Sequence, residues 1–372
     1  MKTPLDYIPQ EIIQAQDYES LANAFLDPTT YAYISGGAAT EASLKHNRNA
    51  FDAYQLHPKL LQDVTHGNLK LNLEGQTYPH PIWLGPVAFQ KLAHKDGELA
   101  TSRAAQAMAC PFILSTLSSF SLETVAQTVS SEKWFQLYFQ PSKDATLDLI
   151  KRAENQGYSK IVVTLDASIQ SPSPSAIRAG FKYSDKMQAA NLIGYKTPEA
   201  TLLESHDNPI FQGYMTEAPG LADIEWLLEQ THLPVWVKGV LRSDDAQMLK
   251  EIGISGQIIS NHGGRVLDHV ISPLVAITSI RQAVGKDYPL LLDSGIRSGT
   301  DIFKALALGA DAVLIGRLQV YALAVAGALG VAHLLKTLQQ ELSLCMALTG
   351  CATLNDITAD RLYLNPFHNR TE

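Results

Sequence analysis

The spacing of hydrophobic and polar positions changes at about residue 70. Before that point apolar residues recur at helical spacing, as at Ile12, Ala15 and Leu21, and Asp27-Pro28 interrupts the run. After it, short apolar or β-branched runs alternate with helix-sized segments such as 97–109 and 300–308. The pattern predicts an N-terminal helical segment over residues 1–70, followed by alternating strands and helices.

Eight of the apolar runs are candidate strands. Strands that alternate with single helices favour a parallel sheet, and eight such units favour a closed (β/α)8 TIM barrel of the α/β class. We therefore treat 1–372 as a single domain. The runs are Pro81–Leu84, Pro111–Leu114, Trp134–Tyr138, Lys160–Thr164, Pro234–Lys238, Gln257–Ile259, Pro289–Leu292 and Ala312–Ile315.

One interval between strands is much longer than the others. Residues 167–233 separate the fourth and fifth runs, and contain the stretch Ser171-Pro172-Ser173-Pro174-Ser175 with little periodic signal around it. Loops of this length in a compact domain are usually lids or functional insertions. We expect an insertion between strands four and five that lies over a site.

Composition narrows the classes of partner. The 372 residues carry a net charge of -8, which argues against nucleic acid or an anionic membrane as the main partner. The three cysteines have neither metal-ligand nor CxxC spacing, so we expect no metal site and a reducing, cytoplasmic location. They are Cys110, Cys345 and Cys351.

Targeting and membrane signals are weak. The start, Met1–Asp6, lacks the apolar core of a signal peptide. The longest apolar run, Val320–Leu335, is broken by Gly327, Gly330 and His333, so we expect a packed helix and no membrane span.

Polar side chains gather where the predicted strands end. The chemistry of such barrels lies at the carboxyl ends of the strands. One polar strand end is ordinary, since strands must exit to solvent, but six at the same end of a barrel favour a site. They are Tyr138, Asp166, Lys238, His262, Asp293 and Arg317.

The richest of these strand ends is Ser260-Asn261-His262-Gly263-Gly264-Arg265. It places a proton acceptor and an anion-binding guanidinium in one turn, and the glycines allow close backbone approach or positive φ. Alternatively, it is a glycine-rich loop with a solvated arginine. Lys238 is open to two interpretations as well: a cation beside an electron-rich ligand, or a lysine whose stem is buried and whose ammonium reaches solvent.

The stretch Asp293–Asp301 precedes a helix and is rich in glycine. Such turns present backbone N–H groups to an anion, and Arg297 and Arg317 would add charge-assisted bonds to a phosphate. Phosphate sites after strands seven and eight recur in TIM barrels. The alternative is a surface turn that caps a helix.

These motifs together resemble the FMN-dependent 2-hydroxy acid oxidase and dehydrogenase family, which includes glycolate oxidase, lactate oxidase, mandelate dehydrogenase and the flavin domain of flavocytochrome b2. The resemblance covers nearly the whole chain. It is carried by Tyr31–Gly37, Asn47–Phe51, Ala93–Glu98, Phe135–Tyr138, Val237–Val240, Ser260–Asp268, Asp293–Arg317 and Met346–Cys351.

The resemblance implies oxidation of an L-2-hydroxy acid to the 2-oxo acid. His262 would be the base and Asp166 would stabilise its imidazolium. Arg265 and Tyr33 would hold the substrate carboxylate, with Tyr138 near the hydroxyl. Oxygen, a quinone or another carrier would reoxidise the cofactor, and the assembly would be a homotetramer or larger.

The resemblance also implies that FMN is the cofactor. Lys238 would face the flavin N1–C2=O edge and stabilise the reduced form. Residues at the flavin ring or ribityl chain would be Val87, Ala88, Ser115, Gln136, Thr164 and Ser260. Residues at the ribityl and phosphate groups would be Asp293, Gly295, Arg297, Gly316 and Arg317.

Two positions depart from the family pattern. An ungapped comparison puts Ser173 where relatives carry a second carboxylate-binding arginine, and Arg178 is the nearest replacement. Losing that contact would cost about 1.5–3 kcal/mol of substrate binding. Leu117 replaces an aromatic residue near the substrate. We therefore expect a substrate other than simple glycolate or lactate, with a bulkier or more apolar side chain.

Two other functions remain open from the sequence. One is an FMN barrel with different chemistry, such as a type 2 isopentenyl diphosphate isomerase, which would not need His262 and Arg265 together. The other is a flavin-binding protein that has lost turnover.

Overall fold

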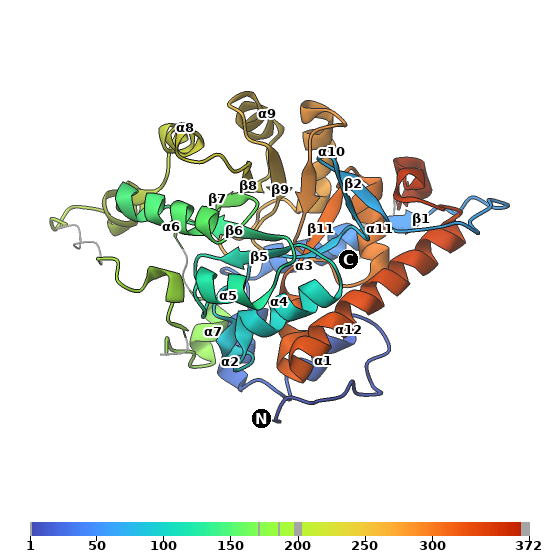
Figure 1. Cartoon of the computed structure of the whole chain (residues 1–372), viewed down its shortest axis with the longest axis horizontal. Coiled ribbons are helices and arrows are strands. Elements are labelled where there is room, and N and C mark those ends of the chain that lie inside the picture. Colours follow the sequence, from blue (N-terminus) through green and yellow to red (C-terminus); the bar gives the residue numbers. More distant parts are fainter. Residues whose placement is uncertain (1, 170–171, 185–186, 197–202, 366–372) are drawn as a thin grey trace.

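The computed structural model describes residues 2–169, 172–184, 187–196 and 203–365. Eight parallel strands close into a barrel in the order β10-β11-β4-β5-β6-β7-β8-β9. Figure 1 shows helices lying around these strands. All eight coincide with runs predicted from the sequence, so the predicted TIM barrel is confirmed. The strands are β4 (Ile82–Leu84), β5 (Phe112–Ser115), β6 (Lys133–Leu137), β7 (Ile161–Thr164), β8 (Val235–Val240), β9 (Gly256–Ile259), β10 (Leu290–Leu292) and β11 (Ala312–Ile315).

The barrel interior is packed with tryptophan. Trp83, Trp134 and Trp236 come from the alternate strands β4, β6 and β8, and their rings lie 5.3 and 5.0 Å apart in sequence order. Side chains of non-adjacent strands can meet in this way only across the interior, where alternate strands supply one layer. Gly256 makes room for Trp236, because a Cβ there would lie 2.5 Å from the indole ring.

Helices follow the strands around the outside of the barrel. They are α4 (Gly97–Ala107), α5 (Leu122–Thr128), α6 (Lys143–Asn155), α8 (Leu221–Gln230), α9 (Ser243–Glu251), α10 (Pro273–Val284), α11 (Gly299–Ala307) and α12 (Arg317–Thr349). Among the described helices, α12 alone is long and apolar enough to cross a membrane. Most of its apolar stretch is buried, however, and it packs on α1, α4 and α11 with a break at Ala326–Gly327.

The N-terminal segment adds three helices, α1 (Asp17–Ala22), α2 (Pro28–Ser35) and α3 (Ala42–Asp52). The Asp27 side chain caps α2 by accepting from the N–H groups of Thr29 and Thr30. The helices end at Asp52, although the sequence predicted helix to about residue 70. The following residues instead form β1 (Tyr54–Leu56), which pairs with β12 (Leu362–Leu364) at the other end of the chain. A hairpin of β2 (Leu71–Leu73) and β3 (Gln76–Tyr78) then leads into the barrel.

The long interval after β7 contains short elements before α8, which is the regular barrel helix. They are α7 (Pro174–Arg178) and the short helices η3 (Ala190–Leu192), η4 (Pro209–Gly213) and η5 (Tyr214–Glu217). α7 packs against α2, so this interval contacts the N-terminal segment. We call the irregular stretch 167–220 the insertion.

Candidate active site

A cavity opens at the carboxyl ends of the strands, and residues on or directly after all eight strands line it. Tyr33 and Ile34 of α2 contribute a further wall. The site residues predicted from the sequence line this cavity, except Asp166, Ser260 and Leu117. Those in the lining are Tyr33, Val87, Ala88, Ser115, Gln136, Tyr138, Thr164, Lys238, His262, Arg265, Asp293, Gly295, Arg297, Gly316 and Arg317.

His262 is oriented by Asp166, which lies just behind the cavity wall. The His262 Nδ1 and Asp166 Oδ1 atoms are 3.1 Å apart. A carboxylate can only accept, so Nδ1 carries the proton and Nε2 is left as a base. Burial alone would raise the pKa of Asp166, but Lys238 and His262 outweigh it and hold the pKa below its usual value. Asp166 therefore stays ionised beside the imidazole.

A β-bulge in β8 gives Asp166 its space. The pairing of β8 with β9 shifts register between Lys238 and Val240, so Gly239 is the inserted residue. Gly239 has a φ of +107°, and a Cβ there would lie 2.6 Å from Cβ of Asp166. A side chain at residue 239 would displace the carboxylate that orients His262.

Lys238 is a buried cation with fixed partners. Its Nζ lies 2.7 Å from Ser260 Oγ and 3.2 Å from Asp293 Oδ2. Burial alone would lower the pKa of Lys238, but Asp293 and Asp166 hold it above the usual value. The ammonium is therefore charged and aimed at the cavity. Ser260 also accepts from the backbone N–H of His262 at 3.1 Å, so it couples the base to the lysine.

Arg265 is held by the carboxyl end of α2. Its Nη1 donates to the carbonyl oxygens of Tyr33 at 2.7 Å and of Ile34 at 3.0 Å. Its guanidinium lies 4.9 Å from the centre of the Tyr33 ring. Phe181 of the insertion stacks on that ring at 4.3 Å and 9°. One ring face cannot hold both neighbours, so Tyr33 lies between Arg265 and Phe181.

Two further arginines approach the cavity from the side of β10 and β11. Arg297 pairs with Glu19 of α1, with Nε to Oε2 at 2.6 Å. Arg317 donates to the carbonyls of Ile34 at 2.9 Å and Gly263 at 2.8 Å, and no carboxylate in the described part of the chain forms an ion pair with it. Burial, together with the charge of Arg265, lowers the pKa of Arg317 to about 9. A buried cation in this position is stabilised by an anion.

Helix α3 joins the two turns that carry these groups. Asn47 and Asn261 exchange side-chain hydrogen bonds of 2.9 and 2.7 Å, and both amides are buried. The next residue, Arg48, donates to the Gly295 carbonyl and pairs with Asp301 at 2.7 Å. The turn of His262 and the turn of Gly295 are thus fixed to the same helix.

Comparison with known proteins agrees with this geometry. Residues 22–364 match the family described as FMN-dependent dehydrogenase. The chain belongs to the FMN-dependent dehydrogenase family.

Several relatives of the family have similar sequences or structures. An L-lactate oxidase of Alicycliphilus denitrificans is 52% identical over 97% of this chain and 99% of its own. Glycolate oxidase 3 of Arabidopsis thaliana is 37% identical over 94% of this chain and 95% of its own. The crystal structure of mandelate oxidase with (S)-2-phenylpropionate superimposes with a TM-score of 0.83 at 36% identity, over 94% of this chain and 98% of the other. A further mandelate oxidase structure contains a C4a-OH-FMN adduct.

The cofactor of the family, FMN, fits the cavity of this chain. The side chains of Gln136 and Thr164 are buried in its wall, yet Gln136 Nε2 and Thr164 Oγ1 have no hydrogen-bond partner among the described residues. Buried polar atoms are seldom left unsatisfied, and the polar edge of a flavin ring has both donors and acceptors. The arginine side of the cavity has the positive charge that a phosphate needs. A cofactor that has both a flavin ring and a phosphate would satisfy the unpartnered polar atoms at one end of the cavity and the positive charge at the other.

Neither Ser173 nor Arg178 belongs to the cavity of this family member. Ser173 is buried, and its hydroxyl caps α7 by accepting from the N–H of Ala176 at 3.2 Å. A Cβ on Gly36 would lie 2.3 Å from the Ser173 oxygen, so α7 touches the backbone of α2 here. Arg178 is exposed at the end of α7 and does not line the cavity. Arg265 and Arg317 are thus the arginines that lie beside the turn of His262.

Replacing Ser173 with arginine is expected to destabilise the protein without improving substrate binding. The larger side chain has no room against Gly36, and the helix cap is lost, so we expect a loss of about 1–3 kcal/mol in unfolding free energy. Urea unfolding and the KM for L-lactate measure the two effects. Ser184→Arg, at an exposed insertion position, is the control. A tenfold lower KM at unchanged stability would instead place residue 173 in the substrate site.

The sequence did not identify Phe181, Glu19 or Asn47 as site residues. Phe181 and Glu19 have no local motif, because they reach the site only through the packing of the insertion and of α1. Asn47 lies in Asn47–Phe51, one of the stretches that carried the family resemblance, so its pairing with Asn261 could have been suspected from the sequence.

Proposed function

We propose that this protein oxidises an L-2-hydroxy acid to the 2-oxo acid, with FMN as the immediate electron acceptor and oxygen as the final one. The observation that carries the proposal is the His262–Asp166 pair facing the same cavity as Arg265. The His262–Asp166 pair supports catalysis over a flavin-binding protein without turnover. His262 and Arg265 together support an acid oxidase over a diphosphate isomerase, which would not need both. The oxidases among the relatives support oxygen as the final acceptor.

In this reaction the substrate loses two electrons and two protons. Nε2 of His262 takes one proton, and ionised Asp166 stabilises the resulting imidazolium. FMN, when bound, would supply the acceptor for the two electrons and for the second proton. We propose that Lys238, charged and held by Asp293, stabilises the negative charge that develops at the flavin ring edge.

Substrate binding is assigned to Arg265, Tyr33 and Tyr138. Nη1 of Arg265 is engaged with backbone carbonyls, which leaves its other N–H groups for the substrate carboxylate. Burial raises the pKa of Tyr33, so its phenol stays protonated and can donate a hydrogen bond. We assign the ring side of the cavity to Val87, Ala88, Ser115, Gln136 and Thr164, and the phosphate side to Gly295, Arg297, Gly316 and Arg317.

Two observations bear on which 2-hydroxy acid is the substrate, and they point in different directions. Relatives named L-lactate oxidase support a short substrate. The single carboxylate-binding arginine supports the expectation from the sequence that glycolate and lactate are poor substrates. Leu117 does not line the cavity, so it adds no support for a bulky side chain. The cytoplasmic location and the homo-oligomeric assembly stay predictions.

Anaerobic titration of the yellow holoprotein with a panel of 2-hydroxy acids tests the proposal. We expect L-acids to bleach the flavin absorbance, with low efficiency for lactate and glycolate, and air to restore the colour with formation of hydrogen peroxide. High catalytic efficiency on lactate would contradict the expectation about the substrate. If no acid in a broad panel bleaches the flavin, the proposed function is wrong.

A further inference from the structure

Asn191 is a fully buried polar residue of the insertion, and none of the roles above uses it. It lies on η3 against the carboxyl end of β5, about seventy residues in sequence from the loop that its side chain contacts. Buried amides are retained where their hydrogen bonds are satisfied. The hydrogen bonds of the Asn191 side chain therefore show which part of the barrel the insertion holds in place.

The Asn191 amide has four polar neighbours in one loop of the barrel. Its Oδ1 accepts from the N–H of Leu122 at 2.7 Å. Its Nδ2 lies within reach of three acceptors, the carbonyls of Ser115 at 3.3 Å and Thr116 at 3.1 Å and the Ser118 hydroxyl at 2.9 Å. The loop from the end of β5 to the start of α5 is thus held at both ends by one side chain.

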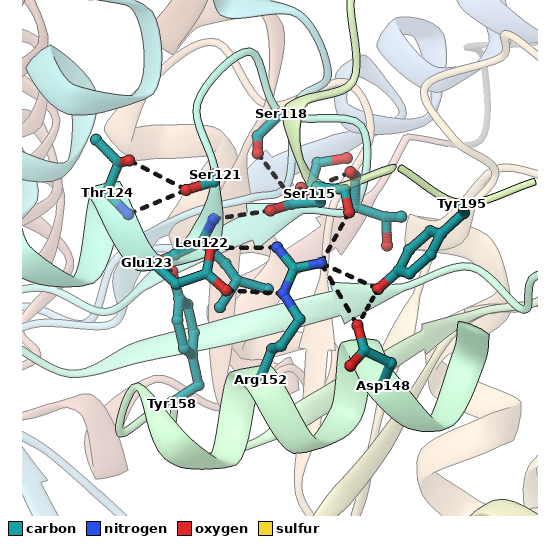
Figure 2. Close-up of polar contacts among 12 residues, drawn as sticks. Ser115, Ser118, Ser121, Leu122, Glu123, Thr124, Asp148, Arg152, Tyr158 and Tyr195 are labelled. Atoms are coloured by element: carbon teal, nitrogen blue, oxygen red, sulfur yellow. Dashed lines mark hydrogen bonds and ion pairs between the residues drawn. The ribbon is translucent and has the colours of Figure 1, made fainter. Parts of the chain in front are cut away.

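A second set of contacts holds the Asn191 backbone in place. Arg152 of α6 donates to the Asn191 carbonyl at 2.9 Å. It also donates to the Tyr195 hydroxyl at 3.0 Å, as Figure 2 shows. The same guanidinium binds both oxygens of Glu123 on α5, at 2.7 and 3.1 Å. Tyr195 in turn donates to Asp148 at 2.5 Å. Two barrel helices and the insertion therefore meet at Arg152.

The held loop is connected directly to the cavity wall. Thr116 donates through its hydroxyl to the Gln136 carbonyl at 2.6 Å and accepts from the N–H of Tyr138 at 3.1 Å. The Ser115 hydroxyl donates to Gln136 Oε1 at 3.2 Å. Ser115, Gln136 and Tyr138 all line the cavity. A shift at Asn191 would thus be passed to the side chains that face the flavin ring.

We propose that Asn191 is a positioning residue that fastens the insertion to the ends of β5 and β6 and so fixes the ring-binding wall of the cavity. Asn191 acts through Ser115, Thr116 and Gln136, and it lies away from the arginines that face the phosphate. Loss of the Asn191 side chain is expected to weaken binding of the flavin ring and, as a further effect, binding of the substrate. Only the effect on the substrate rests on the proposed function.

The test compares FMN with riboflavin, which lacks the phosphate. The full-length protein is freed of flavin and titrated with each, and binding is followed by quenching of flavin fluorescence. For Asn191→Ala we expect binding of both flavins to weaken by the same factor, about tenfold. This factor corresponds to the net free energy of roughly one hydrogen bond, which is lost because the ring-binding wall is no longer held in place. Asn208→Ala, at an exposed position of the same insertion, is the matched control and should bind as wild type.

Two results would overturn the proposal. One is unchanged affinity for both flavins in folded Asn191→Ala with only a lower melting temperature, because that is the signature of a merely structural residue. The other is weaker binding of FMN alone, which would place the effect at the phosphate. If Asn191→Ala does not fold, Ser118→Ala removes one Asn191 acceptor and should weaken both flavins about threefold; unchanged binding there overturns the proposal as well.

Kinetics separate this proposal from the proposed function. In holoprotein saturated with FMN, Asn191→Ala should raise KM several-fold for every acid that wild type oxidises, since Tyr138 is displaced. If wild type oxidises no 2-hydroxy acid, the proposed function is wrong, but the two flavin titrations still decide the role of Asn191.

Discussion

Replacing His262 with asparagine is expected to lower the rate of flavin reduction about a thousandfold or more while FMN stays bound. General base catalysis contributes about 10²–10⁴ to such rates, and asparagine cannot accept the proton. Asparagine suits this position because the backbone of His262 has a φ of +56°, which asparagine tolerates better than most residues. Anaerobic stopped-flow reduction by the best acid of the panel measures the loss.

The visible flavin spectrum is the internal control for the His262 variant, because it reports that the cofactor site is intact. His66→Asn, at an exposed histidine outside the cavity lining, is the matched substitution and should leave the rate unchanged. A His262→Asn enzyme that keeps more than a tenth of the wild-type rate with bound FMN would show that another group takes the proton.

Replacing Arg265 with lysine is expected to lower kcat/KM about 10²–10³-fold, mainly through KM. Each hydrogen bond to a charged group is worth about 1.5–3 kcal/mol, and a lysine cannot hold two α2 carbonyls and a carboxylate together. The loss should be larger here than in a site with two arginines, since neither Ser173 nor Arg178 reaches the cavity. Steady-state kinetics at saturating oxygen measure both parameters.

Arg242→Lys is the matched control for Arg265, because Arg242 is exposed and its ion pair within the described part of the chain is with nearby Asp244. Its kinetics should equal those of wild type. If Arg265→Lys raises KM by less than threefold, the substrate carboxylate is held by another group. Flavin absorbance again shows whether the cofactor site survives the substitution.

The barrel was predictable because its strands are buried on both faces. Strands such as β7 and β11 therefore appear as continuous apolar runs that end at polar residues, and the carboxyl ends of parallel strands meet at one face. His262, Lys238 and Arg317 could be placed together for this reason. The end of the N-terminal helices could not be placed, because β1 pairs with β12, which is more than three hundred residues away.

Contacts across the chain explain the remaining differences. Sequence spacing cannot show that Glu19 pairs with Arg297, or that Phe181 stacks on Tyr33, since each pair forms only when separate segments pack. An ungapped comparison identified Ser173 as unusual, and the structure adds that the position is a helix cap against Gly36.

Helix α3 limits how such a protein can be recombined. Its residues Asn47 and Arg48 bind the turn of the base and the turn beside the phosphate side of the cavity. The N-terminal segment and these two inner turns therefore depend on one another. An N-terminal segment taken from another protein would need to be transferred together with its own matching residue at position 261.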